Sequence, residues 1–229
     1  MYVASFDIGK KNFSFYIEEF DCLSLSNVEN ICKNQRYNAN GTVTSEMNEV
    51  LNKVCKNGRT ILFKNSDLTE GCKKGKYIDN ELYHNMTDLL DEYKEYWNIC
   101  SYFVVEMQMS FGKKHNTMAL KLGQHCQAYF YIMYGRFKTV VEFPAYHKTQ
   151  VLGAQKIEKR TKNGKVTYKA IDKPQRKKWS IEKAKEIFEL REEVESLDML
   201  TRSRKKDDLA DVVTMLNAWK YLMFVDKCI

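Results

Sequence analysis

The 229-residue sequence predicts an α/β fold in which helices flank a mixed central β-sheet. Two features carry this prediction: a β-hairpin that opens the chain, and a second buried strand that follows an amphipathic helix. In the hairpin, residues 3–8 are mostly apolar, residues 9–12 form a turn, and residues 13–18 alternate between apolar and polar side chains. The second strand, residues 100–108, follows a helix predicted over residues 80–97, whose apolar side chains recur at helical spacing. A helix that connects two strands favours their parallel pairing in one sheet.

The other elements are predicted from similar patterns. Residues 21–77 are polar and are interpreted as a third strand plus an irregular insertion. The helix predicted over 117–134 is apolar on more than one side, which is typical of a helix that is central to the core or also buried in a subunit contact. A short strand is expected over 138–143, and the last helix over 202–223. Since the chain has only two prolines and ten glycines, we expect no long linkers and predict one domain over residues 1–229.

The composition indicates an intracellular protein with an anionic partner. The net charge is +7, and no apolar run reaches the roughly 18 residues of a membrane span. The chain does not open with a charged segment followed by an apolar stretch, so no secretion signal is expected. The seven cysteines are odd in number and irregularly spaced, which suits reduced thiols. A zinc site stays open as an alternative, although no C-x2-C pair is present, and its candidate ligands are Cys22, Cys32, Cys55 and Cys72.

Positive charge is concentrated in residues 156–178, which we call the basic patch. The patch contains ten Lys or Arg and two acids, a net charge of +8, so the rest of the chain sums to −1. Asn163-Gly164 predicts a two-residue type I′ turn between two short strands. A cationic hairpin suits contact with the phosphate backbone of a nucleic acid, and a solvated charged loop is the alternative. The next helix is predicted to open at Lys177, with a buried stripe formed by Ile181, Ala184 and Phe188.

Two acids lie at the ends of the two buried strands, Asp7 on the first and Glu106 on the second. If these strands are parallel neighbours, both carboxylates emerge at the carboxyl edge of the sheet, where open α/β sheets place their sites. Gln108 points the same way as Glu106 if the strand continues. An ionised carboxylate is costly to bury without a partner, so each acid either caps a strand end or faces a cation.

A second pair of acids lies on the last predicted helix. Asp208 and Asp211 are three residues apart and flank the apolar stripe of this helix, whereas Asp207 lies further round toward solvent. A capping role at the helix N-terminus accounts for one of these acids but not for Asp211, which lies a turn inside the helix. Like charges at this spacing destabilise a helix unless a cation offsets them.

These four carboxylates can converge only around positive charge. Hard oxygen ligands select magnesium or manganese over zinc. Two such ions, roughly 3.5–4 Å apart, can activate water and stabilise the leaving oxygen of a phosphodiester. Together with a basic patch that attracts a polyanion, the acids predict a metal-dependent nuclease.

Four segments of the sequence resemble the RuvC-type Holliday-junction resolvases, in particular the branch found in poxviruses and other large DNA viruses. They are FDIGKKN at residues 6–12, VVEMQ at residues 104–108, a later lysine-bearing stretch, and KKDDLAD at residues 205–211. The mitochondrial resolvases of yeasts share the E-x-Q strand. The resemblance extends from residue 1 to about residue 223, apart from insertions at about 21–77 and 153–172.

The resemblance implies a ribonuclease H-like fold and a homodimer that grips a four-way DNA junction. It implies paired symmetric nicks, made with two magnesium ions per active site, in DNA recombination and repair; manganese is a possible substitute. The metal-binding acids that it implies are Asp7, Glu106, Asp208 and Asp211. The doubled Asp207-Asp208 offers two candidates, of which Asp208 fits the three-residue spacing. The functional lysine of the family best matches Lys178, with Lys148 second, and the long helix after Glu106 corresponds to the dimer-forming helix.

The predicted DNA-binding residues come from the first turn, from a basic loop over 110–116, from Lys148 and from the basic patch. They are Lys10, Lys11, Lys113, Lys114, Lys148, Lys159, Arg160, Lys162, Lys165 and Lys177. If the chain is viral, we expect it to act at the site of viral DNA replication.

Three other classes share parts of this pattern. Actin-like kinases and ATPases have a D-I-G turn, but they need two such domains and a second phosphate loop. A non-catalytic DNA-binding protein explains the basic patch but not the acids at the strand ends. Another ribonuclease H-like nuclease, acting on RNA–DNA hybrids or as a transposase, uses the same acids, and only the shape of the substrate distinguishes it.

Overall fold

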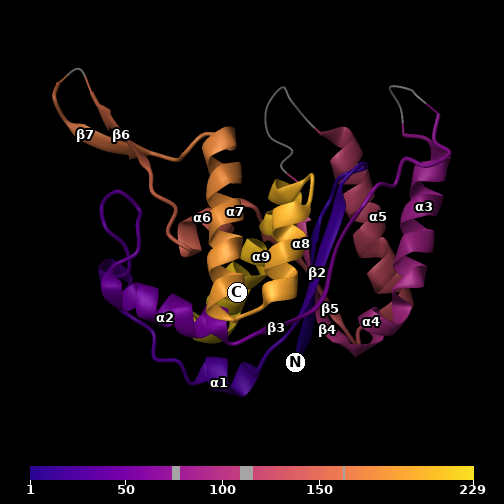
Figure 1. The fold of residues 1–229 in the computed structure, drawn as a ribbon, viewed down its shortest axis with the longest axis horizontal. Coiled ribbons are helices and arrows are strands. Elements are labelled where there is room, and N and C mark those ends of the chain that lie inside the picture. Colours follow the sequence, from indigo (N-terminus) through magenta and orange to yellow (C-terminus); the bar gives the residue numbers. More distant parts are fainter. Residues whose placement is uncertain (74–77, 109–115, 162) are drawn as a thin grey trace. The chain divides into compact units, whose positions relative to one another are not determined.

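The computed structural model describes residues 1–73, 78–108, 116–161 and 163–229 (Figure 1). By its internal contacts the chain forms two compact units. Unit 1 comprises residues 1–20 and 60–145, and unit 2 comprises residues 21–59 and 146–229. The single domain expected from the sequence stays a prediction, and the two units are described separately.

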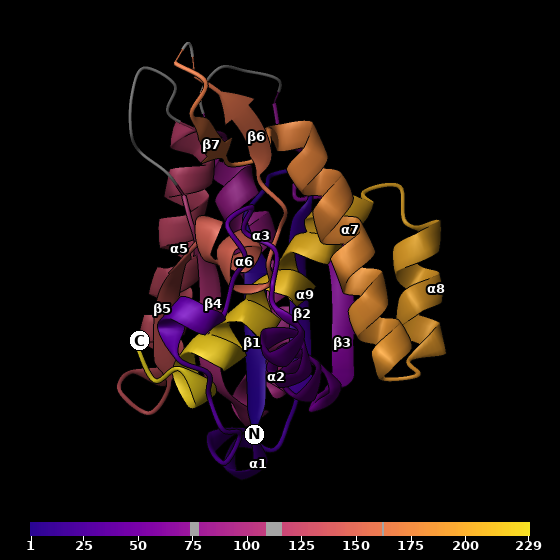
Figure 2. The same ribbon diagram turned by 90° about the vertical axis from the view of Figure 1, so that its left-hand side faces the viewer.

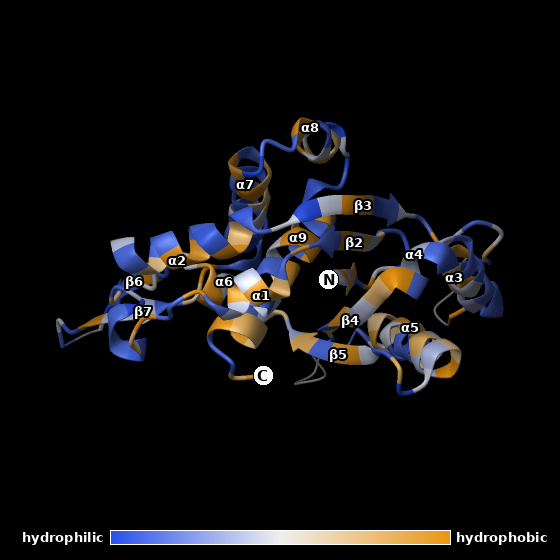
Figure 3. Ribbon diagram, turned by 90° about the horizontal axis from the view of Figure 1, so that it is seen from below, coloured by the Kyte–Doolittle hydropathy of each residue, from blue (hydrophilic) through white to orange (hydrophobic). Residues whose placement is uncertain are grey.

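Unit 1 is built on a five-stranded mixed sheet, which confirms the predicted fold class. The strand order is β3-β2-β1-β4-β5, where β1 and β2 are antiparallel and β1, β4 and β5 are parallel. The bounds of the strands are β1 (Tyr2–Asp7), β2 (Phe13–Glu19), β3 (Arg59–Ser66), β4 (Cys100–Met107) and β5 (Thr139–Pro144). Hydrophobic residues colour much of β4 and β5 in Figure 3, as expected for parallel strands that are buried in a sheet.

Three helices of unit 1 enclose an aromatic core with one face of this sheet. They are α3 (Asn80–Glu92), α4 (Lys94–Ile99) and α5 (Thr117–Tyr134). Phe6 is at the centre of the core, with ring centroids 5.5 Å from Trp97 and 5.2 Å from Phe130. Phe130 of α5 stacks on Phe103 of β4 at 3.8 Å. Helix α5 has the bounds predicted from the sequence, and its packing on β4 fixes it beside the strand that carries Glu106.

Unit 2 is mainly helical. Its helices are α1 (Cys22–Ser26), η1 (Lys33–Gln35), α2 (Ser45–Lys56), α6 (Tyr146–Val151), α7 (Lys173–Leu190), α8 (Val194–Arg202), α9 (Lys206–Lys220) and the π-helix η2 (Tyr221–Val225). Helix α9 is buried over residues 212–220 and packs against α6 and α7. The hairpin of β6 (Ile157–Arg160) and β7 (Val166–Lys169) precedes α7 and extends beyond its N-terminal end (Figures 1 and 2).

Two predicted helices differ from the structure. The helix expected over 80–97 is two helices, because the chain turns at Tyr93 and so brings Trp97 into the core, where its indole N–H donates to the Leu90 carbonyl (2.7 Å). The helix expected over 202–223 begins only at Lys206, after the separate helix α8.

The helix expected to open at Lys177 begins four residues earlier. Asp172 caps it through a reciprocal bond with Gln175, a capping box that the sequence prediction overlooked. Its buried residues include Ala184 and Phe188 as expected, but Ser180 and Ile187 replace Ile181 in the stripe.

The polar insertion contains a regular helix that the prediction missed. Helix α2 is capped by Thr44 and buries an amphipathic face, and Figure 3 shows hydrophobic and hydrophilic residues alternating along it. The two-residue type I′ turn was also wrong. Thr161 N–H donates to the Lys165 carbonyl and Gly164 N–H to the Thr161 carbonyl (both 2.9 Å), so three residues separate Thr161 from Lys165. Gly164 closes this turn with a φ of +75°.

No helix in the described ranges combines the length and the apolar character needed to span a membrane.

Candidate active site

Strands β1 and β4 bring two of the predicted acids together in unit 1. The strands are parallel, and Phe6 lies opposite Val105. Continuing this register by one residue places Asp7 beside Glu106 at the carboxyl ends of both strands, as the sequence predicted. Phe6 and Val105 belong to the aromatic core, and successive side chains of a strand point to opposite faces, so both carboxylates face away from that core. Both residues are half-buried.

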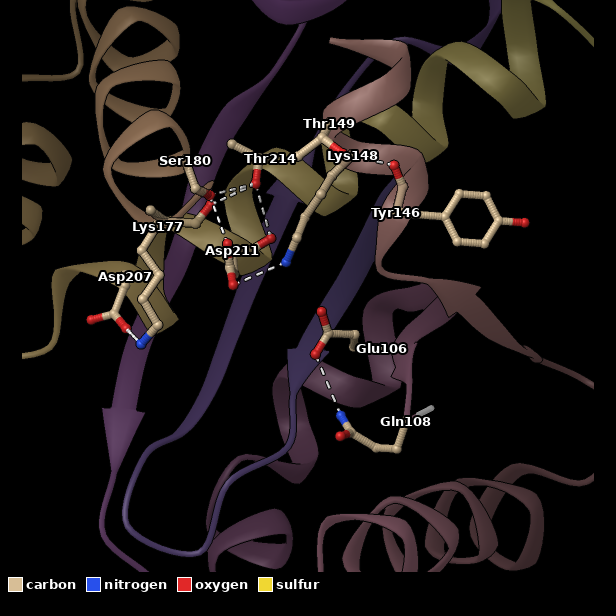
Figure 4. Close-up of polar contacts among 11 residues, drawn as sticks. Glu106, Gln108, Tyr146, Lys148, Thr149, Lys177, Ser180, Asp207, Asp211 and Thr214 are labelled. Carbon is tan, nitrogen blue, oxygen red and sulfur yellow. Dashed lines mark hydrogen bonds and ion pairs between the residues drawn. The ribbon is translucent and has the colours of Figure 1, made fainter. Parts of the chain in front are cut away.

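Gln108 supports Glu106 from the same edge of the sheet. Its side-chain amide donates to Glu106 Oε2 at 3.4 Å (Figure 4). This contact confirms that Gln108 and Glu106 point the same way. The amide therefore orients one oxygen of the Glu106 carboxylate.

In unit 2, three helices converge on Asp211. Lys148 of α6 places its ammonium 2.9 Å from Asp211 Oδ2, and the Ser180 hydroxyl of α7 donates to Asp211 Oδ1 at 2.7 Å (Figure 4). The Lys148 side chain is 3% exposed and that of Asp211 is 22% exposed. Ser180 is fully buried and shares a second hydrogen bond, of 3.1 Å, with Thr214 one turn further along α9. Both carboxylate oxygens of Asp211 are therefore held in place by buried partners.

Asp207 and Asp208, in the first turn of α9, have different surroundings. Burial alone would raise the pKa of Asp207, but its ion pair with Lys177 outweighs burial and holds the pKa below the ordinary value. The same pair raises the pKa of Lys177. For Asp208, burial and the adjacent charge of Asp207 together raise the pKa. Ionised Asp208 is thus the member of this turn that extra positive charge would stabilise most.

The donor chemistry of these acids fits a hard divalent cation. Each unit presents one pair of predicted metal ligands, Asp7 with Glu106 and Asp208 with Asp211, and all of the donors are carboxylate oxygens, which magnesium and manganese prefer. Within the part of the chain that the structure describes, no group of three or more His, Cys, Asp or Glu could hold a metal ion.

The two candidate lysines have different surroundings in the structure. Lys178, ranked first from the sequence, is exposed on α7. Lys148, ranked second, is buried against Asp211. The sequence contained a signal for Lys148. It lies shortly after the end of the parallel strand β5, and Asp7 and Glu106 lie at the ends of β1 and β4. Ser180 was not predicted, since a serine inside a helix carries no sequence signal for a bond to a distant carboxylate.

The remaining predicted DNA-binding residues are placed in three ways. Lys113, Lys114 and Lys162 lie outside the described residues. Lys177 is engaged with Asp207. The others, apart from buried Lys148, are exposed, and they are Lys10, Lys11, Lys159, Arg160 and Lys165. The basic loop predicted over 110–116 lies almost entirely outside the described residues.

The fold is that of known junction resolvases. The chain is similar to the Fowlpox virus resolvase solved with its substrate Holliday junction DNA (TM-score 0.56, 17% identity, 97% of this chain and 99% of that one). It is also similar to the yeast mitochondrial Holliday junction resolvase Ydc2, with a TM-score of 0.52 at 13% identity, over 99% of this chain and 80% of that one. Thermus thermophilus RuvC matches with a TM-score of 0.50 at 12% identity, over 97% of this chain and 96% of that one. These matches define the ribonuclease H-like fold of the RuvC type.

Relatives with higher sequence identity come from two invertebrate iridescent viruses. The chain is 36% identical to the uncharacterized protein 170L of Invertebrate iridescent virus 6, over 99% of this chain and 92% of that protein. It is 34% identical to the uncharacterized protein 97L of Invertebrate iridescent virus 3, over 95% of this chain and 98% of that protein. No protein-family model matches the chain. The chain belongs to the family of these iridescent virus proteins.

The two neighbouring acids of α9 should affect stability with opposite signs in metal-free buffer. Asp207→Asn should lower the free energy of unfolding at pH 7 by about 0.5–1 kcal/mol, because it breaks the pair with Lys177. Asp208→Asn should raise it, because the ionised form of Asp208 is disfavoured in the folded state. Urea denaturation with EDTA, compared with wild type, measures both changes.

The pH dependence provides the control for this pair of variants. Asp208 has the raised pKa. The difference in free energy of unfolding between Asp208→Asn and wild type should therefore be lost first as the pH falls toward and through the ordinary carboxyl range. Asp207 has the lowered pKa, and its stabilising effect should persist to lower pH before it is lost. If both variants changed the free energy of unfolding in the same direction at pH 7, the surroundings assigned to Asp207 and Asp208 would be wrong.

Proposed function

We propose that this protein is a structure-selective DNA endonuclease that resolves four-way (Holliday) junctions by metal-dependent phosphodiester hydrolysis, giving paired symmetric nicks. The observation that carries the proposal is the parallel register of β1 and β4, in which Phe6 lies opposite Val105 and the next residues of the two strands are Asp7 and Glu106. It occurs in a chain with the fold of three Holliday junction resolvases, one of them solved with its junction substrate. Because the relatives in sequence are viral proteins, we also propose that the protein acts at the site of viral DNA replication.

We assign the metal ligands of this reaction to Asp7, Glu106, Asp208 and Asp211, binding two magnesium ions, with manganese as a substitute. When bound, such ions supply an activated water and stabilise the leaving oxygen of the phosphodiester. The chain itself orients the ligands: the Gln108 amide holds Glu106, and Ser180 holds one oxygen of Asp211. Fixed ligand orientation of this kind is typically worth a factor of about 10–100 in metal affinity or activity.

Lys148 is the proposed functional lysine. Its ammonium is removed from water and points at Asp211, so its charge is little screened. In the absence of metal it neutralises Asp211. In the reaction the same fixed positive charge would stabilise the negative charge that develops on the phosphodiester, as preorganised cations do in active sites.

A nicking assay tests the proposal. Wild type should nick a synthetic four-way junction in symmetric pairs with magnesium, and linear duplex, single strand and RNA–DNA hybrid should be left intact. Asp7→Asn and Asp211→Asn should each abolish cutting while junction binding persists, and the double variant should be no worse than either single variant. The matched control is Asp88→Asn, an exposed acid on α3, which should cut normally. Preferential cutting of the hybrid would identify a ribonuclease instead.

Substitutions of Lys148 and Lys178 should have different effects on the cutting rate in the same assay. Lys148→Met should slow cutting by about 100-fold or more, because it removes a buried cation from the site. Lys178→Met, on the exposed side of α7, should change the rate by no more than a few-fold. Circular dichroism and junction binding confirm that each variant is folded. The reverse order of effects would restore Lys178 as the functional lysine.

We further propose a homodimer formed through α5, since two symmetric nicks require two active sites related by a two-fold axis. Ile132 on α5 is 80% exposed, and Phe137 just beyond it is 99% exposed. Ile132→Glu should convert a dimer into a monomer in sedimentation experiments and should uncouple the two nicks. Val194→Glu, at a 74% exposed position on α8, is the control and should leave the mass unchanged. A monomeric wild type would contradict this arrangement.

A further inference from the structure

The β6–β7 hairpin is ordered at its base and exposed along its strands. Lys156 N–H donates to the Asn40 carbonyl at 2.7 Å on one side, and the capping box of Asp172 begins α7 on the other. All eight strand residues are exposed, and in the described part of the chain β6 and β7 pair only with each other. Both faces of the hairpin are therefore accessible to a ligand.

The two faces of the hairpin have different chemistry. Cross-strand pairs share a face, and the register pairs Glu158 with Tyr168 and Arg160 with Val166. We call these four residues the aromatic face; its acid and its arginine pair at 3.4 Å, so its net charge is zero. The opposite face, which we call the lysine face, consists of Ile157, Lys159, Thr167 and Lys169 and carries a net charge of +2.

The aromatic face offers an accessible ring. Tyr168 is 39% exposed and its neighbour Val166 is 41% exposed. Since the charges of Glu158 and Arg160 offset each other there, the attraction of this face for a ligand comes from its apolar and aromatic surface. A neutral face with a tyrosine ring matches the plane of a nucleic-acid base, whereas the lysine face matches phosphates.

We propose that Tyr168 stacks on a base exposed at the branch point of the DNA, while Lys159 and Lys169 contact phosphates beside it. In closed duplex the base planes are covered by their neighbours and only the base edges reach the grooves, so a ring can stack only where a base is unstacked. A branch point or a single strand provides such a base. This inference rests on the proposed function for its branched substrate, and it assigns the hairpin to recognition of the branch.

The experiment compares Tyr168→Leu with Tyr168→Phe in the full-length protein with EDTA, so that no cutting occurs. Affinity is measured for a four-way junction, linear duplex and single strand, each with 2-aminopurine at the branch or at the corresponding position. Tyr168→Leu should weaken junction binding by about tenfold, as loss of base stacking does, and should remove the quenching of 2-aminopurine. Tyr168→Phe keeps the ring and should bind like wild type. Tyr96→Leu is the matched control, because Tyr96 is 37% exposed on α4, and it should bind normally.

Salt dependence separates the two faces. Lys159→Ala with Lys169→Ala should reduce the slope of log affinity against log salt by about 1–2, whereas Tyr168→Leu should leave the slope unchanged. Equal weakening of duplex and junction by Tyr168→Leu, or unchanged quenching, would overturn the stacking. If wild type cuts none of the substrates but Tyr168→Leu still weakens junction binding, the stacking would be supported and the endonuclease refuted. If wild type cuts the junction but Tyr168→Leu binds it like wild type, the endonuclease would be supported and the stacking refuted.

Discussion

Negative charge held in partly buried positions is the constraint on which the structure of the candidate site depends. Asp211 is tolerated because a nearly buried ammonium, that of Lys148, lies 2.9 Å from one of its oxygens. Removing one partner of such a pair leaves an uncompensated charge, which is far more costly than the pair itself is stabilising. Three helices of unit 2 are therefore tied to one carboxylate: α6 through Lys148, α7 through Ser180 and α9 through Asp211 itself.

The adjacent acids of α9 show how the chain distributes the remaining charge. Asp207 is paired with Lys177, and the pair lowers its pKa despite burial. Asp208 makes no ion pair among the described residues, and burial together with Asp207 raises its pKa. A half-buried carboxylate whose ionised form is disfavoured, beside one that is paired with a lysine, is a candidate for a functional site. This difference favours Asp208 over Asp207 as the ligand for an added cation.

The sequence predicted the features that depend on chain topology. A helix between two buried strands implies parallel neighbours, and parallel neighbours bring Asp7 and Glu106 to one edge of the sheet. The helix of residues 117–134 was also predictable, because its apolar pattern is long and continuous. The bend at Tyr93 was not, since it depends on where Trp97 packs. The ion pair of Lys148 with Asp211, 63 positions later in the chain, was not predictable for the same reason, because it depends on how α6 packs against α9. By contrast, helix α2 and the capping box of α7 had local signals, Thr44, Asp172 and Gln175, that a closer interpretation of the sequence would have used.

The cations of the basic patch have two kinds of surroundings, and Lys177 marks the boundary between them. Lys177 belongs to the patch by sequence, yet its charge is used by Asp207 and so contributes to holding the acids of α9. Toward the hairpin, Lys159 and Lys169 face solvent on one side of the strands. The basic patch thus pairs with Asp207 at its Lys177 end and leaves uncompensated positive charge at its hairpin end. Uncompensated charge on an exposed hairpin attracts a polyanion but does not discriminate between shapes of DNA. Discrimination requires a group that responds to unstacked bases, and Tyr168, on the neutral face of the same hairpin, has the chemistry to provide it.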